Sequence, residues 1–117
     1  MSTPALIIVR ATVQPGHDQE FHDWMEKVHL PDVKRLMGYK TARRYEVMSS
    51  FAGTELHPSA AATTSHRYLA VYEYDDAAAV QRHMAGPDIA TLRQSFNTDV
   101  GAIATREANV YRQIYPR

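Results

Sequence analysis

The stretch FHDWMEKVHLPDVKRLMGYKTARRYEV, residues 21–47, decides the fold because two different periodicities meet in it. Its first part carries apolar side chains at helical spacing: Phe21, Trp24, Met25 and Val28. Pro31 lacks a backbone N–H, so it predicts a kink or an end of this helix next to His29. After Gly38 the period changes to two, which predicts a strand. A histidine at such a break can mark the edge of a small-molecule pocket.

The flanking sequence supplies further elements, bounded by turn and capping residues. Pro15-Gly16 ends a first apolar strand, Asp18 can cap the first helix, and Asp75-Asp76 can cap a second one that Gly86-Pro87 breaks. The expected elements are strand 6–13, helix 18–29 with a further turn or two over 32–37, strand 39–48, strand 67–74, helix 77–84, a helical segment from 88 through 96, and strand 107–115.

This order, β-α-β-β-α-β, predicts a single α+β domain over residues 1–117 with the ferredoxin-like fold. Its four-stranded antiparallel sheet carries both helices on one face. Residues 49–66 are rich in Ser, Ala, Thr, Gly and Pro and show no period. We expect a long mobile loop there, either a lid or an insertion.

Two helices cover only one face of such a sheet, yet both faces of the predicted strands carry bulky groups. Tyr68, Tyr72 and Tyr74 alternate with Leu69 and Val71. An uncovered face bearing several tyrosines predicts contact with another subunit. We therefore expect a homodimer in which two sheets pack face to face.

Composition narrows the classes of function. The 117 residues include 13 basic and 13 acidic side chains, and this zero net charge argues against nucleic acid or an anionic membrane as the main partner. The absence of cysteine excludes disulfides, thiolate nucleophiles and Cys-ligated metals. The first residues match neither a signal peptide nor a membrane span, which predicts a cytoplasmic protein. No phosphate-binding glycine loop or dinucleotide fingerprint occurs, so no nucleotide or flavin cofactor is expected.

Several short motifs in this chain resemble a known group of proteins. They are His29-Leu30-Pro31, Gly38-Tyr39, Ala42-Arg43-Arg44-Tyr45 and Tyr68-Leu69-Ala70-Val71-Tyr72-Glu73. In this order they resemble the dimeric α/β-barrel superfamily, and within it the small EthD-like proteins. The resemblance implies the ferredoxin-like fold and a dimer. Relatives commonly show Trp-Tyr-Asn-x-Glu-His, whereas this chain has Val28 in place of the acid beside His29.

His29 is the first candidate catalytic residue. An unperturbed imidazole titrates near pH ~6.5 and can both give and take a proton. The alternative is a helix-terminal histidine that only satisfies a loose carbonyl.

Arg43, Arg44 and Tyr45 form the second group of candidate catalytic residues. Adjacent strand residues point to opposite faces, so one arginine can hold a carboxylate or enolate oxygen while the other pairs with an acid such as Glu73 or Glu46.

Aromatic side chains provide candidate substrate-binding residues. Trp24, Tyr45 and Tyr72 would form an aromatic wall with polar tips for a flat apolar ligand, and Met25 is placed with them. Such stripes also occur as plain core. Glu73 would act as a base if it were buried, or would pair with an arginine.

His22, Glu26 and His29 share one helix face, an arrangement that could in principle supply a metal triad. The outer two are separated by about two turns, roughly 10 Å, which is far for a common metal centre. No metal is expected.

Two functions from different classes remain open. One is a cofactor-independent enzyme that performs isomerase, lyase or cyclase chemistry on an apolar carbonyl, phenolic or polyketide-like compound, with a cofactor-free quinol monooxygenase as a variant. The other is a non-catalytic dimer that binds a small apolar ligand or assists a pathway. Convergence of His29 and an arginine on one cavity would favour the enzyme.

Overall fold

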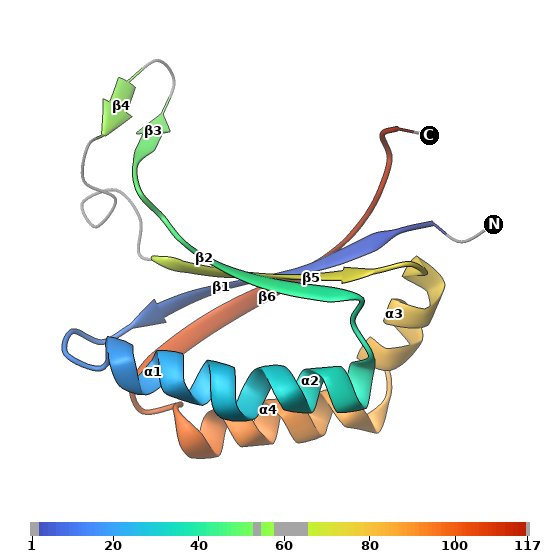
Figure 1. Cartoon of the computed structure of the whole chain (residues 1–117), viewed down its shortest axis with the longest axis horizontal. Coiled ribbons are helices and arrows are strands. Elements are labelled where there is room, and N and C mark those ends of the chain that lie inside the picture. Colours follow the sequence, from blue (N-terminus) through green and yellow to red (C-terminus); the bar gives the residue numbers. More distant parts are fainter. Residues whose placement is uncertain (1–2, 53–54, 58–65, 117) are drawn as a thin grey trace.

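A computed structural model describes residues 3–52, 55–57 and 66–116. Its main sheet is antiparallel in the order β2-β5-β1-β6, formed by β1 (Ala5–Val13), β2 (Thr41–Glu46), β5 (Tyr68–Tyr74) and β6 (Ala104–Arg112). The helical elements are α1 (Asp18–Trp24), the π-helical turn η1 (Met25–His29), α2 (Leu30–Met37), α3 (Ala77–Met84) and α4 (Pro87–Asp99). All of them lie on one side of the sheet (Figure 1). The predicted α+β, ferredoxin-like fold is confirmed.

Strand register determines which side chains point toward the helices. Ile7 of β1 lies opposite Tyr72 of β5 and Val110 of β6, and Ala42 of β2 lies opposite Tyr72 in turn. Because successive strand residues alternate between faces, these positions share the helix-covered face. The buried residues of the core gather there with the inner sides of the helices, among them Phe21, Val80, Leu92 and Phe96.

The uncovered face differs in composition from the one that the sequence predicted. Tyr68, Tyr72 and Tyr74 are all buried under the helices, so they are not on the open face. The predicted period of two is confirmed, but the predicted face of the tyrosines is wrong, because bulky aromatics fit either side of a sheet. The open face instead carries aliphatic side chains at its centre and two tyrosines toward its margins: Leu6, Ile8, Leu69, Val71, Tyr45 and Tyr111.

The helix next to Pro31 neither ends nor leaves a gap in its hydrogen bonding. The N–H of Leu30 donates to the carbonyl of Met25, a bond that spans five residues instead of four. This wider turn lies directly before Pro31, which is in the first turn of α2 and donates no backbone hydrogen bond. The helix then ends at Gly38, whose φ of 61° is a left-handed C-cap conformation that favours glycine.

Two boundaries and one loop depart from the predictions. β2 is shorter than the expected strand 39–48, and β6 covers Ala104–Arg112 instead of 107–115. Within the predicted loop 49–66, β3 (Ser50–Ala52) and β4 (Glu55–His57) pair antiparallel, so a two-stranded sheet replaces part of the expected loop. The rest of that loop, residues 53–54 and 58–65, lies outside the described residues. Figure 1 shows β3 and β4 projecting from the main sheet on the side opposite the helices, while the C-terminal segment projects from its other end.

No helix in the described part of the chain has the length and apolar character to cross a bilayer.

Candidate functional site

A cavity of about 500 Å³ lies between the sheet and the helices α2 and α4. Apolar side chains form most of its wall, including Ile7, Val33, Leu92 and Phe96. A smaller set of polar residues also lines it: His29, Tyr72, Arg93, Asn97, Thr105 and Arg106. This volume and this mixture of many apolar and few polar groups are typical of sites for small organic molecules.

His29 is held in the cavity wall by an aromatic neighbour that is itself fixed. The imidazole is only 4% exposed and stacks on Trp24, with ring centroids 4.8 Å apart. The Trp24 indole Nε1 donates a hydrogen bond of 2.8 Å to Asp99 Oδ2 on α4. The π-helical turn thus places His29 inside the domain, and α1 and α4 together fix its orientation.

The ring nitrogens of His29 have different surroundings. Nε2 lies 3.4 Å from the Nη1 of Arg106, and because a guanidinium only donates, Nε2 accepts and Nδ1 carries the proton. Nδ1 is buried and has no hydrogen-bond partner among the described residues. Burial, followed by the positive charge of Arg106, lowers the pKa of His29 to about 4. At neutral pH the ring is therefore a proton acceptor and not, as its unperturbed value predicts, an acid and a base in equal measure.

Arg106 on β6 lines this site beside His29, although the sequence pattern did not single it out. Its guanidinium lies over the ring of Phe96, 4.1 Å from the centroid, and forms no ion pair with a carboxylate in the part of the chain described. Burial is the main cause that lowers its pKa. The predicted strand began at residue 107, which left Arg106 in a loop. In the observed register it lies opposite Ala11, on the helix-covered face.

Tyr72 and Arg44 extend the polar part of the site toward α1. Tyr72 is 2% exposed, its hydroxyl has no partner within the described residues, and burial raises its pKa. A small cavity of about 20 Å³ brings Met25, Arg44 and Tyr72 together with His29. Arg44 Nη2 lies 3.0 Å from His22 Nδ1, and burial lowers the pKa of Arg44. The structure therefore gathers His29, Arg44, Tyr72 and Met25, with Trp24 directly behind His29.

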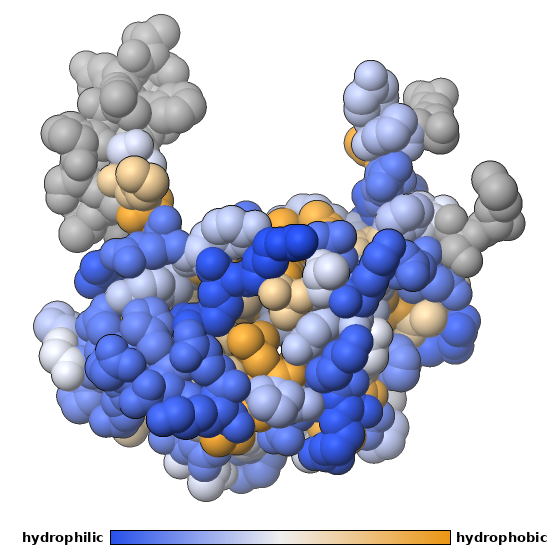
Figure 2. Space-filling model, viewed as in Figure 1, coloured by the Kyte–Doolittle hydropathy of each residue, from blue (hydrophilic) through white to orange (hydrophobic). Residues whose placement is uncertain are grey.

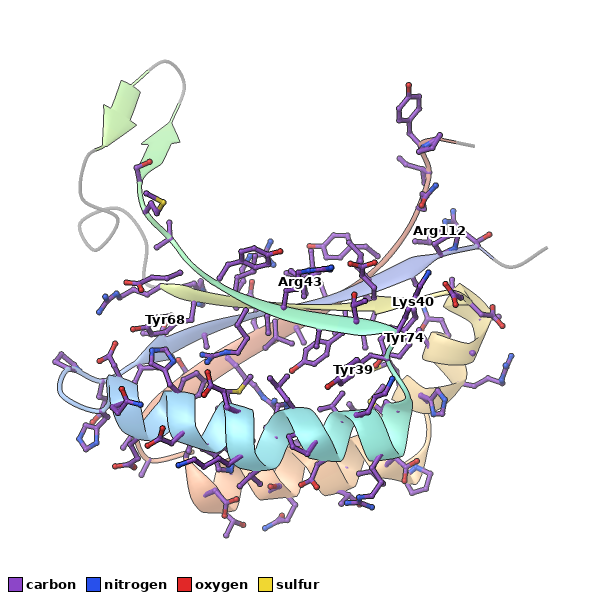
Figure 3. The ribbon with its side chains drawn as sticks, in the orientation of Figure 1. Tyr39, Lys40, Arg43, Tyr68, Tyr74 and Arg112 are labelled. Carbon is purple, nitrogen blue, oxygen red and sulfur yellow. The ribbon has the colours of Figure 1, made fainter. Side chains whose placement is uncertain are left out.

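The remaining sequence candidates lie on the other face of the sheet. Arg43 and Tyr45 alternate with Arg44 and so point away from the helices, as Figure 3 shows for Arg43. Arg43 Nη1 forms an ion pair of 2.7 Å with Glu73 Oε1, and both side chains are partly exposed. This confirms the prediction that one of the adjacent arginines pairs with an acid. It also separates Arg43, Tyr45 and Glu73 from the cavity, so the structure does not bring them to His29.

The histidines do not assemble a metal site in the described residues, where no three His, Asp or Glu side chains lie close enough to hold an ion. His22 and His29 each have an arginine as a neighbour. Their charges would oppose a bound cation.

Comparison with known proteins identifies relatives of the chain. The EthD domain matches residues 14–104. Among solved structures, an EthD family protein from Bacillus halodurans is 16% identical, with a TM-score of 0.62 over 96% of this chain and 99% of that one. An EthD-like protein from Ralstonia eutropha is 13% identical, with a TM-score of 0.63 over 100% of this chain and 97% of the other.

A third similar structure is SnoaB, a cofactor-independent oxygenase from Streptomyces nogalater. It is 18% identical, with a TM-score of 0.57 over 99% of this chain and 100% of that one. At these identities the likeness shows the fold alone. No curated protein matches the chain.

Proposed function

Since the chain belongs to the EthD domain family, we propose that it is a cofactor-independent enzyme that moves a proton on a small, largely apolar carbonyl or phenolic compound. The observation that carries this proposal is the convergence of His29 and Arg106 on one cavity of about 500 Å³. A base beside a cation is the combination that proton abstraction next to a carbonyl requires.

The proposed step uses the chemistry of these two side chains. The Nε2 of His29 takes a proton from an acidic C–H or O–H of the substrate, and the electron pair of that bond moves onto the substrate oxygen. Arg106 stabilises the oxyanion, and the hydroxyl of Tyr72 is a second donor in the same cavity. The contact of 3.4 Å between Arg106 and Nε2 is long, so a substrate can displace it.

The lowered pKa of His29 also favours return of the proton. With a pKa of about 4, the ring is neutral at physiological pH and available as a base. Once protonated, it is a stronger acid than a free imidazolium and delivers the proton to another atom of the same substrate. This sequence gives an isomerisation and, in a substrate with a suitable leaving group or second carbonyl, a lyase or cyclisation reaction.

The variant chemistry is a cofactor-free oxidation. Similarity to a cofactor-independent oxygenase supports it, because the same deprotonation of a quinol yields an anion that can react directly with dioxygen. The remaining alternative is a dimer that only binds an apolar ligand, which the apolar cavity wall would also serve.

Two probes separate these functions. The first is 2-tetralone, whose enolisable C–H is followed by deuterium exchange in NMR, and the second is 1,4-dihydroxynaphthalene, followed by oxygen uptake. We expect His29→Gln to lose most of the catalysed rate, and His17→Gln, on an exposed turn, to keep it. Catalysed exchange without oxygen uptake supports the isomerase type, and uptake supports the oxygenase. An unchanged rate in folded His29→Gln would remove the catalytic role, and no catalysis of either probe would favour the binder.

The proposal includes a homodimer formed through the open face of the sheet. Leu6, Ile8 and Val71 form an apolar centre there, and Figure 2 shows hydrophobic groups along this side of the domain, between the two projecting segments. Packing of a second sheet on this face would bury the apolar centre. Light scattering after gel filtration should give twice the mass of 13.2 kDa for the wild type and the monomer mass for Val71→Lys. Ala90→Lys, on the exposed side of α4, should remain dimeric, and a monomeric wild type would contradict the proposal.

A further inference from the structure

The charged groups around the main cavity are not balanced. Arg106 and Arg93 line it, and no aspartate or glutamate does so among the described residues. Arg93 lies on the exposed side of α4, where water solvates its charge. Arg106 is partly buried, and burial is the leading cause that lowers its pKa. Arg106 is therefore the one partly buried cation beside this largely apolar volume, and the lining supplies it with no counter-charge.

Two acids around Trp24 and His29 already have other partners. Asp99 accepts the hydrogen bond from Trp24, and Asp32, whose charge acts on His29, pairs with Arg35 at 3.3 Å. Buried cations in proteins are normally paired, because desolvation of an isolated charge is costly. The arrangement at Arg106 thus departs from the usual pattern.

The hydrogen-bond donors of Arg106 and Tyr72 are a second unusual feature of this site. The ring of Phe96 holds the guanidinium from one side, and the only side-chain hydrogen bond of Arg106 in the described structure goes to His29. A guanidinium carries five N–H donors, so most of them remain available. The buried hydroxyl of Tyr72 lines the same cavity without a partner in that part of the chain. The polar end of the site therefore offers donors and one positive charge.

The other wall of the cavity is apolar and adaptable. Met37, Met84, Ile89 and Leu92 line it between α2, α3 and α4. Methionine side chains have three rotatable bonds and fill irregular space around flat or branched hydrocarbons. A volume of about 500 Å³ lies within the range of sites for organic molecules larger than one ring.

We propose that the natural ligand is an apolar monocarboxylate, with its carboxylate on the Arg106 guanidinium and its hydrocarbon part against the methionine-rich wall. This inference rests on the proposed function, because it concerns the same cavity: the carboxylate takes two of the five guanidinium N–H groups, which leaves the others and the Tyr72 hydroxyl for the oxyanion. One partly buried cation matches one negative charge, and the planar guanidinium fork matches the two oxygens of a carboxylate. A phosphate ester would bring about two charges at neutral pH to a site with one buried cation.

The test compares two probes of nearly identical shape, 2-naphthoate and naphthalene-2-carboxamide, by calorimetry near neutral pH. We expect the wild type to bind the carboxylate about tenfold or more tightly than the amide. Arg106→Gln should lose that preference while still binding the amide, and Arg106→Lys should recover part of it as a point charge. Arg43→Gln, on the opposite face, should behave as the wild type does.

Equal affinity of the wild type for both probes, or no detectable binding of 2-naphthoate at millimolar concentration, would overturn the inference, and neither result requires a variant to fold. An unchanged preference in folded Arg106→Gln would overturn it as well. Because calorimetry measures binding without turnover, these outcomes are independent of the proton-exchange assay. His29-dependent exchange of 2-tetralone without a preference for the carboxylate would therefore leave the proposed function standing and remove this ligand class.

Discussion

Arginines on the two faces of the sheet have different neighbours. On the open face, Arg43 forms an ion pair with Glu73 where solvent already screens its charge. On the helix-covered face, Arg106 has a histidine and an aromatic ring as neighbours but no carboxylate partner among the described residues. Electrostatic stability alone would favour the reverse arrangement, because an unpaired charge costs more where water is scarce. A cation without a carboxylate partner on the covered face is the feature on which the proposed carboxylate site depends.

The packing that holds His29 gives the largest expected difference between the faces. Trp24 is buried, stacks on His29 and bonds to Asp99, so Trp24→Ala removes a large core side chain together with its stacking contact and its hydrogen bond to α4. We expect the free energy of unfolding to fall by roughly 3–5 kcal/mol. Urea titration followed by far-UV circular dichroism measures this change, because the variant lacks the only tryptophan.

Tyr45→Ala on the open face is the matched control for Trp24→Ala. Tyr45 is 50% exposed, so its removal should cost less than about 1 kcal/mol if the chain is monomeric in the assay. A similar loss in both variants would show that the helix-covered face is not the more tightly packed of the two.

The pH dependence of stability tests the burial of His29. Its pKa is about 4 in the folded chain and 6.5 for an ordinary exposed ring, so the unfolded chain binds more protons between these two values. Stability should therefore be complete above about pH 6.5 and fall as the pH drops toward 4. The difference between the two pKa values corresponds to roughly 3 kcal/mol.

His29→Gln should flatten this part of the pH profile, since glutamine does not titrate. Any slope that remains in the variant would come from groups other than His29, which both chains share. Urea midpoints measured at several pH values for the two proteins give the comparison directly. Identical slopes in both proteins between pH 4 and 6.5 would mean that His29 is not buried as described.

The elements of the fold could be predicted because they depend on local patterns. Helical and strand periodicities and Asp76 as an N-cap are properties of short stretches of chain, although the N-cap of α1 is His17 and not the expected Asp18. The candidate site depends on register across the sheet, which no short stretch contains. His29 and the opposite facing of Arg43 and Arg44 could therefore be predicted. Arg106 could not, because its position follows from pairing with Ala11 in a distant strand.

The ion pair of the open face should contribute little to stability. Arg43 and Glu73 are about half exposed, so water and salt screen their attraction. A double-mutant cycle with Arg43→Ala and Glu73→Ala should give a coupling free energy of about 0.2–1 kcal/mol, smaller still at high salt. A coupling above about 2 kcal/mol that resists salt would contradict the distinction between the faces.

The smallest effect is expected from the hydroxyl of Tyr72. Because this buried hydroxyl has no partner in the described structure, Tyr72→Phe removes an unsatisfied polar group and keeps the ring, so stability should stay within about 0.5 kcal/mol of the wild type or rise. Tyr68→Phe on the same strand and face is the matched control, since its hydroxyl donates to Asp18. Loss of that bond should cost about 1–3 kcal/mol. If Tyr72→Phe binds 2-naphthoate less tightly while its stability is unchanged, the hydroxyl serves the ligand and not the fold, which is the role proposed for Arg106 on the same face.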